Sequence, residues 1–372
     1  MRKAPIVVVG GGVIGLFCAY ELVRAGHAVT VLEKGQVGAE ASWAAGGILS
    51  PLHPWRYPAP VTALAQFGGR AYPGLCESLH GASGIDPEWT PSGLLRLGGD
   101  ETGRALAWAT EFGVALEATS AAQHRGRAPM ATDDAALWLP DVAQVRSPRL
   151  LRALKGSLVA AGVLVHEQAR VERLSWRGSR ISGVVVRGEE LPAEAVVVAS
   201  GPWSRALLAD YGLALPVHPV RGQMIRIEAP PGLLNTMILK GSHYLIPRRD
   251  GAVVVGSTLE ETGFEKDVTA DARTELREFA CDLVPALGSY PVTHQWAGLR
   301  PSSPEGVPFI GEHPELTRLF VNTGHFRNGI VLSPGSARLM TDLIVQRSPF
   351  LDPEPYRLDG RGGGTRSSSE VL

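Results

Sequence analysis

Cysteine is scarce in this sequence. Its three cysteines, Cys18, Cys76 and Cys281, stand far apart and form neither a CxxC pair nor a cluster with histidine. Such spacing argues against a structural zinc site and against a disulfide framework, and we expect no metal. It is typical of a protein in a reducing compartment, so we expect a cytoplasmic location.

An excess of basic residues is also lacking, and so are long apolar runs. Lysine and arginine number 36 against 37 aspartates and glutamates, so we expect no nucleic-acid partner. The apolar stretch 6–19 is interrupted by four glycines, and nowhere else do about 18 uncharged apolar residues follow one another. We therefore expect neither a signal peptide nor a membrane span.

Glycines mark the first functional pattern. We expect strands at 6–9 and 28–32 and a helix at 13–25 between them, a βαβ unit. Gly10, Gly12 and Gly15 form a GxGxxG pattern where the first strand meets the helix. Gly10 permits a tight turn, Gly12 lets the backbone approach a pyrophosphate, and Gly15 allows close packing of helix on strand. Glu33 ends the second strand, where it can accept hydrogen bonds from a ribose, so the sequence predicts a dinucleotide site.

The glycine pattern fits NAD as well as FAD, and two later segments favour FAD. Residues 40–51, EASWAAGGILSP, form a loop of small side chains that lets backbone amides approach an isoalloxazine ring. Residues 196–204, VVVASGPWS, indicate a buried strand that breaks at Gly201-Pro202. In two-domain flavoproteins such a strand packs beside the adenosine half of the cofactor.

The rest of the chain alternates between predicted strands and helices. Residues 39–60 are too irregular for regular structure, which is typical of a functional loop. A Ser-Pro pair predicts the start of a helix over 333–345, and the low-complexity tail 357–372 predicts disorder. Further predicted elements are a helix at 148–161, strands at 163–167, 193–201, 253–256 and 319–322, and a strand pair across 171–186.

Segments spread along the whole chain resemble one known family. In order, they are VVVGGGVIGL with VLEKG, ASWAAGGIL, VVVASGPWS, VRGQM, HYLIPRRDG, VVGSTLE, WAGLRPSSPEGVPFIG and GHFRNGIVLSPGSA. Together they are similar to the D-amino-acid-oxidase superfamily of FAD enzymes, and most to the glycine oxidases associated with thiamine biosynthesis. The resemblance runs from residue 6 to residue 356.

The resemblance implies an α/β, two-domain flavoprotein that assembles as a tetramer. A Rossmann-like FAD-binding domain would comprise residues 1–47, 141–214 and 297–356, and a mixed-sheet substrate-binding domain residues 48–140 and 215–296. Besides the glycines and Glu33, the positions that match cofactor contacts of the family are Val13, Ile14, Lys34, Ala41, Ser42, Gly46, Gly47, Ile48, Val171, His325, Phe326, Arg327, Asn328, Gly329, Ile330 and Val331.

Three residues are expected to face the substrate. Arg300 follows Gly298 and precedes Pro301, which restrict the backbone, and its planar guanidinium can bind a carboxylate in bidentate fashion. In the resembling enzymes this position binds the carboxylate of the amino acid, and Tyr244 matches a tyrosine whose hydroxyl assists. Arg327 belongs to the turn that the family places at the flavin, before a helix whose N-terminus points to the ring.

The expected reaction is oxidative deamination of glycine, sarcosine or a small D-amino acid. A hydride would pass from Cα to flavin N5, and dioxygen and water would then give hydrogen peroxide, the 2-oxo acid and ammonia or an amine. The protein mainly positions and polarises, in keeping with the lack of a Ser/His/Asp or paired-carboxylate signature. The alternatives are a dehydrogenase that uses an acceptor other than dioxygen and a non-catalytic FAD-binding subunit; two candidate carboxylate-binding arginines disfavour the latter.

Two departures from the family pattern bear on the site. Trp55, Arg56 and Tyr57 are expected near the pocket entrance, where they would slow the oxidation of bulky substrates. Ser302 and Ser303 occupy the neighbourhood in which the sarcosine oxidases of this superfamily attach flavin through cysteine. We therefore expect FAD to be bound non-covalently.

Overall fold

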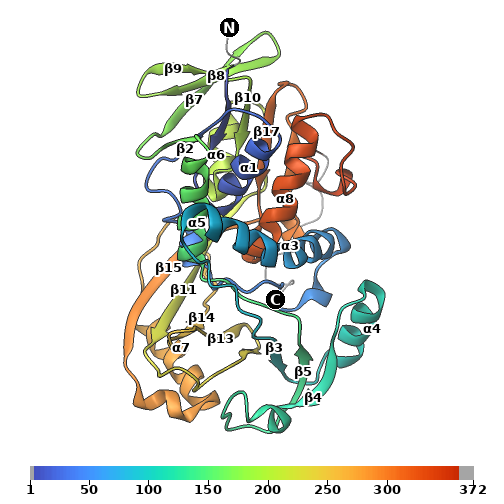
Figure 1. Ribbon diagram of the computed structural model, residues 1–372, viewed down its shortest axis with the longest axis vertical. Coiled ribbons are helices and arrows are strands. Elements are labelled where there is room, and N and C mark those ends of the chain that lie inside the picture. Colours follow the sequence, from blue (N-terminus) through green and yellow to red (C-terminus); the bar gives the residue numbers. More distant parts are fainter. Residues whose placement is uncertain (1–3, 360–372) are drawn as a thin grey trace.

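The computed structural model describes residues 4–359, and the predicted disordered tail lies outside the described residues from residue 360 onward (Figure 1). One half of the fold is built on a sheet with strand order β16-β17-β10-β1-β2-β6. All neighbours pair in parallel except β16, which pairs antiparallel with β17 at one edge. The strands are β1 (Ile6–Val9), β2 (Val29–Leu32), β6 (Leu164–His166), β10 (Ala195–Val198), β16 (Phe309–Glu312) and β17 (Leu319–Thr323).

The alternation of side chains along β1 divides the core of this half into two layers. Ile6 and Val8 pack with the helices on one face, whereas Val7 and Val9 pack with a small three-stranded sheet on the other. The helices are α1 (Val13–Arg24), α3 (Ala59–Ser83), α5 (Ser147–Ala160) and α8 (Gly329–Ile344). The opposite face carries β7 (Val171–Arg177), β8 (Arg180–Val186), β9 (Glu189–Pro192) and α6 (Ser204–Ala209). The predicted βαβ unit and the strand pair across 171–186 are confirmed.

The other half is an eight-stranded mixed sheet with order β15-β11-β14-β13-β12-β3-β5-β4, parallel only between β12 and β3. Helix α7 (Ala270–Leu283) covers one face, and the other face turns toward Ile48 and Leu52 from the first half. Figure 1 shows β11 and β15 running together from this sheet toward the first half. The strands are β3 (Leu94–Leu97), β4 (Glu117–Ser120), β5 (Ala135–Leu139), β11 (His218–Ile227), β12 (Met237–Lys240), β13 (His243–Pro247), β14 (Val253–Gly256) and β15 (Val292–Ser302).

Short helices complete the chain. The α-helical ones are α2 (Ala41–Ala44) and α4 (Thr102–Phe112), and the 3-10 helices are η1 (Pro54–Arg56), η2 (Ala121–His124), η3 (Gly201–Trp203), η4 (Pro285–Ser289), η5 (Pro304–Gly306), η6 (Phe326–Asn328) and η7 (Glu354–Tyr356). This α/β architecture of two sheet-based halves confirms the predicted fold class. The predicted domain ranges follow the strands of the three sheets, although β15 runs on to Ser302 and α3 packs with α8 and α5 rather than with the eight-stranded sheet. The boundaries stay a prediction.

The predicted start of the last helix at residue 333 is wrong. Helix α8 begins at Gly329 and contains Pro334, which has no N–H to bond to the carbonyl of Ile330. The Tyr72 hydroxyl donates to that carbonyl at 2.7 Å, and so does the Ser333 hydroxyl at 2.7 Å. Because these donors replace the missing N–H, the helix continues through the proline.

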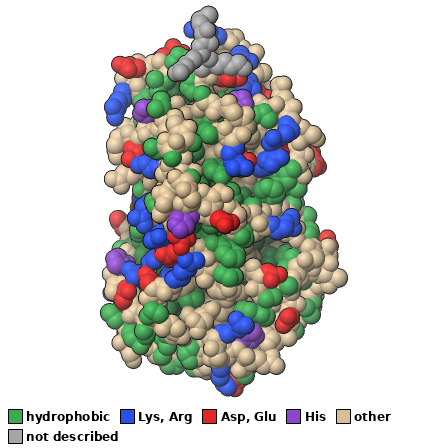
Figure 2. All heavy atoms as spheres, viewed as in Figure 1, with side chains coloured by type: hydrophobic (Ala, Val, Ile, Leu, Met, Phe, Trp, Pro, Cys, Tyr) green, Lys and Arg blue, Asp and Glu red, His purple; other side chains and the backbone are tan. Residues whose placement is uncertain are grey.

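The surface carries charges of both signs side by side (Figure 2). This mixture agrees with a formal net charge of -1, and no strongly basic face indicates a nucleic-acid partner in that view. Within residues 4–359, no helix combines the length and the apolar character that crossing a membrane requires.

Candidate FAD and substrate site

A cavity of about 460 Å³ lies where the two halves meet. It is lined at the carboxyl ends of β1, β2, β10 and β17, which is where parallel α/β sheets bind ligands. The eight-stranded sheet contributes Gly222 from β11, Tyr244 from β13, and Gly298 and Arg300 from β15. The cavity therefore brings the predicted cofactor residues and the predicted substrate residues into one space.

The glycine turn has the close contacts that its pattern predicts. Gly10 has φ of +115° and a side chain there would lie 2.5 Å from the Ala199 carbonyl oxygen. Gly12 caps α1 and lines the cavity. A side chain on Gly15 would lie 1.9 Å from the Gly10 carbonyl oxygen, so Gly15 serves helix packing and does not line the cavity. The amide end of α1 thus opens to the cavity, which favours a phosphate group.

The acidic end of β2 lies beside this turn. The carboxylate of Glu33 accepts hydrogen bonds from the backbone N–H groups of Gly11 at 2.8 Å and Gly35 at 2.9 Å, and its side chain lines the cavity. These bonds fix its orientation, and a carboxylate can accept further bonds from a ligand hydroxyl. Lys34 lies 3.2 Å above the ring of Trp203, another lining residue. Burial lowers the pKa of Lys34.

The small-residue loop forms one wall, with Ala41, Ser42, Gly46, Gly47 and Ile48 all lining the cavity. The Ser42 hydroxyl accepts the N–H of Val13 at 2.9 Å, which ties the loop to α1. A side chain on Gly46 would lie 2.6 Å from the Ile246 side chain and 3.3 Å from the Tyr244 ring. Strand β13 therefore approaches the loop as closely as glycine allows.

The start of α8 forms the opposite part of the lining, from His325 to Ile330, while Val331 packs in the core against α3. His325 Nε2 bonds to the Ser336 hydroxyl at 2.9 Å, and burial lowers the pKa of this imidazole to about 3. His325 Nδ1 and Asn328 Nδ2 are buried without a hydrogen-bond partner among residues 4–359. The unused Asn328 amide donor beside a helix N-terminus favours a ligand that presents a hydrogen-bond acceptor and negative charge, and His325 Nδ1 can donate or accept according to its tautomer.

The guanidinium of Arg300 is held by neutral groups alone in the described part of the chain. It donates to the Ser257 hydroxyl at 2.7 Å and to the Thr258 carbonyl at 3.2 Å. It rests on Gly222, where an added side chain would lie 2.0 Å from two of its nitrogens. Burial, and then the charge of Arg327, lower the pKa of Arg300 to about 10. A partly buried cation without a carboxylate partner in the described residues, open to a cavity, is a site for an anion.

Tyr244 and Arg327 lie in the same cavity. Tyr244 is buried, and its hydroxyl lies near the sulfur of Met224 at 3.8 Å. The hydroxyl also lies close enough to Arg300 to favour its charged form. Arg327 donates to the Ser242 carbonyl, a neutral acceptor, at 3.3 Å. The structure thus brings all three predicted substrate residues together.

The prediction for Trp55, Arg56 and Tyr57 is wrong. None of the three lines the cavity; Trp55 packs with Ala105 and Leu137, and Arg56 pairs with Glu101 at 2.8 Å. Tyr57 is buried in the helical core. Apolar neighbours bury Trp55 and Tyr57, and the ion pair holds the partly exposed Arg56. Ser50 and Leu52 line the cavity instead.

Sequence reasoning named neither Gly222 nor Trp203 as a site residue, although both stand in segments that carry the resemblance. Cys18, Cys76 and Cys281 are free thiols, and no cysteine within residues 4–359 lines the cavity. In the same described part, no cluster of His, Cys, Asp and Glu could hold a metal ion.

The lining fits FAD from one end to the other. The α1 terminus suits a pyrophosphate, Glu33 a ribose, and the unused polar atoms at α8 suit the pyrimidine edge of a flavin. Such a cavity, with an anion-binding arginine on its second wall, defines a flavoprotein oxidoreductase.

Comparison with known proteins gives the family. Residues 5–343 match the DAO family of FAD dependent oxidoreductases, and the chain belongs to that family. The glycine oxidase of Pseudomonas aeruginosa is 46% identical over 360 residues, which cover 96% of this chain and 99% of that protein. The bifunctional protein ThiO/ThiG of Trichormus variabilis is 33% identical over 92% of this chain and 53% of its own length.

Solved structures agree with this result. The crystal structure of glycine oxidase from Geobacillus kaustophilus has a TM-score of 0.91 at 32% identity and covers 98% of this chain and 100% of that one. The predicted family and the predicted FAD cofactor are confirmed. The relatives place the chain with the FAD-dependent amino-acid oxidases.

Proposed function

We propose that this chain oxidises small amino acids that carry a carboxylate on the oxidised carbon, namely glycine, sarcosine or small D-amino acids. The observation that carries the proposal is Arg300: a partly buried guanidinium, facing the FAD cavity, with hydrogen bonds to a hydroxyl and a carbonyl but not to a carboxylate of the described chain. A substrate carboxylate supplies the missing charge. The similarity to glycine oxidases supports glycine as a substrate.

FAD would be held by groups already described: the turn at Gly10 and Gly12, the carboxylate of Glu33, the Ser42–Gly47 loop, and the α8 start. When bound, FAD supplies a two-electron acceptor for the hydride of the substrate Cα and passes the electrons on to dioxygen. The neutral His325 and Asn328 offer hydrogen-bonding atoms without adding a charge that titrates near neutral pH.

Arg300 and Tyr244 orient the substrate. The guanidinium binds both carboxylate oxygens, and the phenol from the neighbouring wall donates to one of them. With the carboxylate fixed at one end, the Cα–H is directed at the cofactor, and this fixed geometry replaces a dedicated acid or base.

Arg327 adds positive charge to the same space, and it interacts electrostatically with Arg300. Positive potential disfavours the ammonium form of the substrate, so it lowers the pKa of the substrate amine. The neutral amine keeps the lone pair that the departing hydride requires. The two arginines therefore bind the carboxylate and favour the reactive amine together.

The overall reaction balances with one amino acid, one dioxygen and one water. A hydride from Cα and a proton from the nitrogen, two electrons and two protons in all, leave the amino acid and reduce dioxygen to hydrogen peroxide. Water then adds to the imine carbon and releases ammonia, or an amine from an N-substituted substrate, leaving the 2-oxo acid.

The test is anaerobic reduction of the purified holoenzyme by glycine, sarcosine, D-alanine, L-alanine and D-phenylalanine, followed as loss of flavin absorbance. We expect reduction by the small substrates and faster reduction by D-alanine than by L-alanine. Peroxide formation in air distinguishes an oxidase from a dehydrogenase that uses another acceptor. If none of the five reduces the flavin, the substrate class is wrong.

We also propose a cytoplasmic tetramer. The three unpaired cysteines favour a reducing compartment, and the tetramer rests on the family resemblance. Light scattering of the purified protein tests the tetramer directly.

A further inference from the structure

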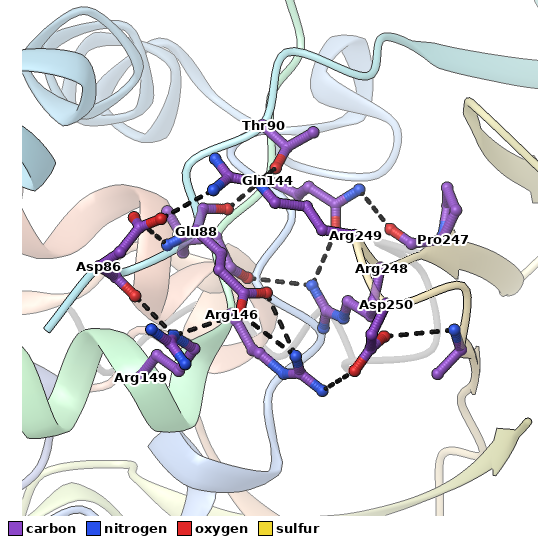
Figure 3. A network of polar contacts seen from close by, with 12 residues as sticks. Asp86, Glu88, Thr90, Gln144, Arg146, Arg149, Pro247, Arg248, Arg249 and Asp250 are labelled. Atoms are coloured by element: carbon purple, nitrogen blue, oxygen red, sulfur yellow. Dashed lines mark hydrogen bonds and ion pairs between the residues drawn. The ribbon is translucent and has the colours of Figure 1, made fainter. Parts of the chain in front are cut away.

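Arg248 belongs to a cluster of charged residues between the two halves and differs from its neighbour Arg146 in its hydrogen-bond partners. Figure 3 shows its side chain pointing to Gln144, next to Arg146, Glu88 and Asp250. Arg146 pairs with Glu88 at 3.2 Å and with Asp250 at 2.8 Å. Arg248 instead donates to neutral acceptors: the Gln144 side-chain oxygen at 2.7 Å and two backbone carbonyls. Burial lowers the pKa of Arg248 to about 10, so the group is charged at neutral pH.

The two carbonyls belong to segments that meet at the cavity wall. Arg248 donates to the Gly46 carbonyl at 2.8 Å and to the Val145 carbonyl at 3.1 Å. Val145 in turn donates its N–H to the Gly47 carbonyl at 2.9 Å. Gly47 has φ of +77°, and a side chain on it would lie 2.0 Å from the Val145 carbonyl oxygen. The guanidinium therefore bridges two backbone segments that already touch.

The strand that carries Arg248 is also the strand that carries the substrate tyrosine. Tyr244, Ile246 and Arg248 are two residues apart, so their side chains leave β13 and its extension on one side. Ile246 and Tyr244 pack against Gly46, and Arg248 bonds its carbonyl. One face of one strand thus contacts the Gly46-Gly47 wall through all three side chains.

We propose that Arg248 is a positioning residue that holds the Gly46-Gly47 wall against FAD and fixes the spacing between the cofactor and Tyr244. The FAD part of this inference rests on the family, and the Tyr244 part rests on the proposed function. A planar guanidinium can reach both carbonyls and Gln144 at once because its donors form a fixed fork. A lysine at this position keeps the charge but lacks that fork, so it can replace only part of the contact.

The test compares Arg248→Ala, Arg248→Lys and the matched control Arg249→Ala. Arg249 is the next residue, is exposed, and bonds to Asp86, Thr90 and the Trp89 carbonyl without contacting the wall. Apoprotein of each variant is titrated with FAD, and the dissociation constant is read from the quenching of flavin fluorescence. The visible spectrum of each holoenzyme and the thermal unfolding of each apoprotein are recorded in parallel.

We expect Arg248→Ala to bind FAD at least about 10-fold more weakly than the wild type and to shift the visible spectrum, because charge-assisted hydrogen bonds are lost. Arg248→Lys should fall between the two, and Arg249→Ala should match the wild type. Equal FAD affinity and an unchanged spectrum in Arg248→Ala, with only a lower unfolding temperature of the apoprotein, would overturn the inference. If Arg248→Ala does not fold, the same comparison is made with Arg248→Lys, and wild-type affinity and spectrum there overturn it.

These measurements need no amino acid. A wild-type protein that oxidises none of the proposed substrates would refute the proposed function and leave the FAD measurements valid. An Arg248→Ala protein with wild-type FAD binding and full activity on glycine would refute the inference and leave the proposed function intact.

Discussion

Replacing Gly222 with alanine should damage substrate binding while leaving the fold and the cofactor in place. The new methyl group would lie 2.0 Å from two nitrogens of Arg300. Since non-bonded atoms settle about 3.5 Å apart, the guanidinium must retreat by about 1.5 Å. The clashing atoms are the far end of a flexible side chain, so the backbone of β11 can stay where it is.

The size of the effect follows from the bonds that this movement breaks. Arg300 would lose its contacts to Ser257 at 2.7 Å and Thr258 at 3.2 Å and would leave the carboxylate position. Misplacing a charged hydrogen bond costs about 1.5–3 kcal/mol, which is roughly 10- to 150-fold in kcat/KM. Arg300→Ala removes the partner of a buried carboxylate and should cost more, about 3–5 kcal/mol.

The assay is anaerobic flavin reduction at varied glycine concentration, with the FAD dissociation constant and unfolding temperature measured alongside. Gly103→Ala is the control, because a side chain there meets no atom within 4 Å. The double variant Gly222→Ala with Arg300→Ala should be no worse than Arg300→Ala alone, since the methyl group then has no guanidinium to displace. A wild-type KM for Gly222→Ala with every substrate would refute the assigned carboxylate site.

Three further predictions concern the stability of helix α8, the charge of Arg300 and the way in which FAD is attached to the protein. Tyr72→Phe should lower the free energy of unfolding by about 1 kcal/mol in urea, and by less in a Pro334→Ala background, where a backbone N–H again serves the Ile330 carbonyl. Because the pKa of Arg300 lies at about 10, acetate binding followed by flavin absorbance should stay constant from about pH 7 to 9 and weaken above about pH 10, as the guanidinium loses its proton; binding that strengthens there would contradict the assignment. Acid precipitation should leave all the yellow colour in the supernatant, since no cysteine of the described chain lines the cavity; a yellow pellet would show a covalent link.

The first βαβ unit could be predicted because its signals are local. Its three signals, the buried valines, the glycine turn and the acidic residue at the strand end, all lie within 28 residues of sequence. Each of them can be interpreted without knowing what the rest of the chain contacts. Helix α3 was not predicted, although Val61, Leu64, Tyr72 and Leu79 are buried on one face. Adjacent glycines and Pro73 within it lower its intrinsic helix propensity, and packing on α8 and α5 supplies the stability that the local sequence lacks.

The Trp55 segment and the start of α8 show how distant contacts decide what local rules leave open. Aromatic residues in a loop near a site suggest an entrance, but Trp55 finds apolar partners in Ala105 and Leu137, about 50 and 80 residues further on. A Ser-Pro pair usually begins a helix, but Tyr72 supplies the hydrogen bond that Pro334 cannot make. Neither partner can be identified from the segment itself.

The position of Arg300 also depends on contacts between distant segments, in this case on the register of two strands. That register leads to a last prediction. Gly222 and Gly298 lie directly opposite each other on β11 and β15, so both lack a side chain on the same face of the sheet. The space over Gly222 holds the Arg300 guanidinium, whereas a side chain on Gly298 would lie 2.6 Å from the Ala44 methyl group.

Gly298→Ala should therefore act on the cofactor rather than on the substrate. A methyl group cannot rotate away from the contact, so α2 must move by about 1 Å to restore normal separation. That movement carries Ser42, whose hydroxyl holds the N–H of Val13 at the start of α1. We expect about 10-fold weaker FAD binding with a nearly unchanged KM for glycine at saturating FAD, the reverse of Gly222→Ala. If both variants raised the KM for glycine and left FAD binding unchanged, the paired glycines would affect only the Arg300 site. The assignment of the α2 loop to the cofactor would then fail.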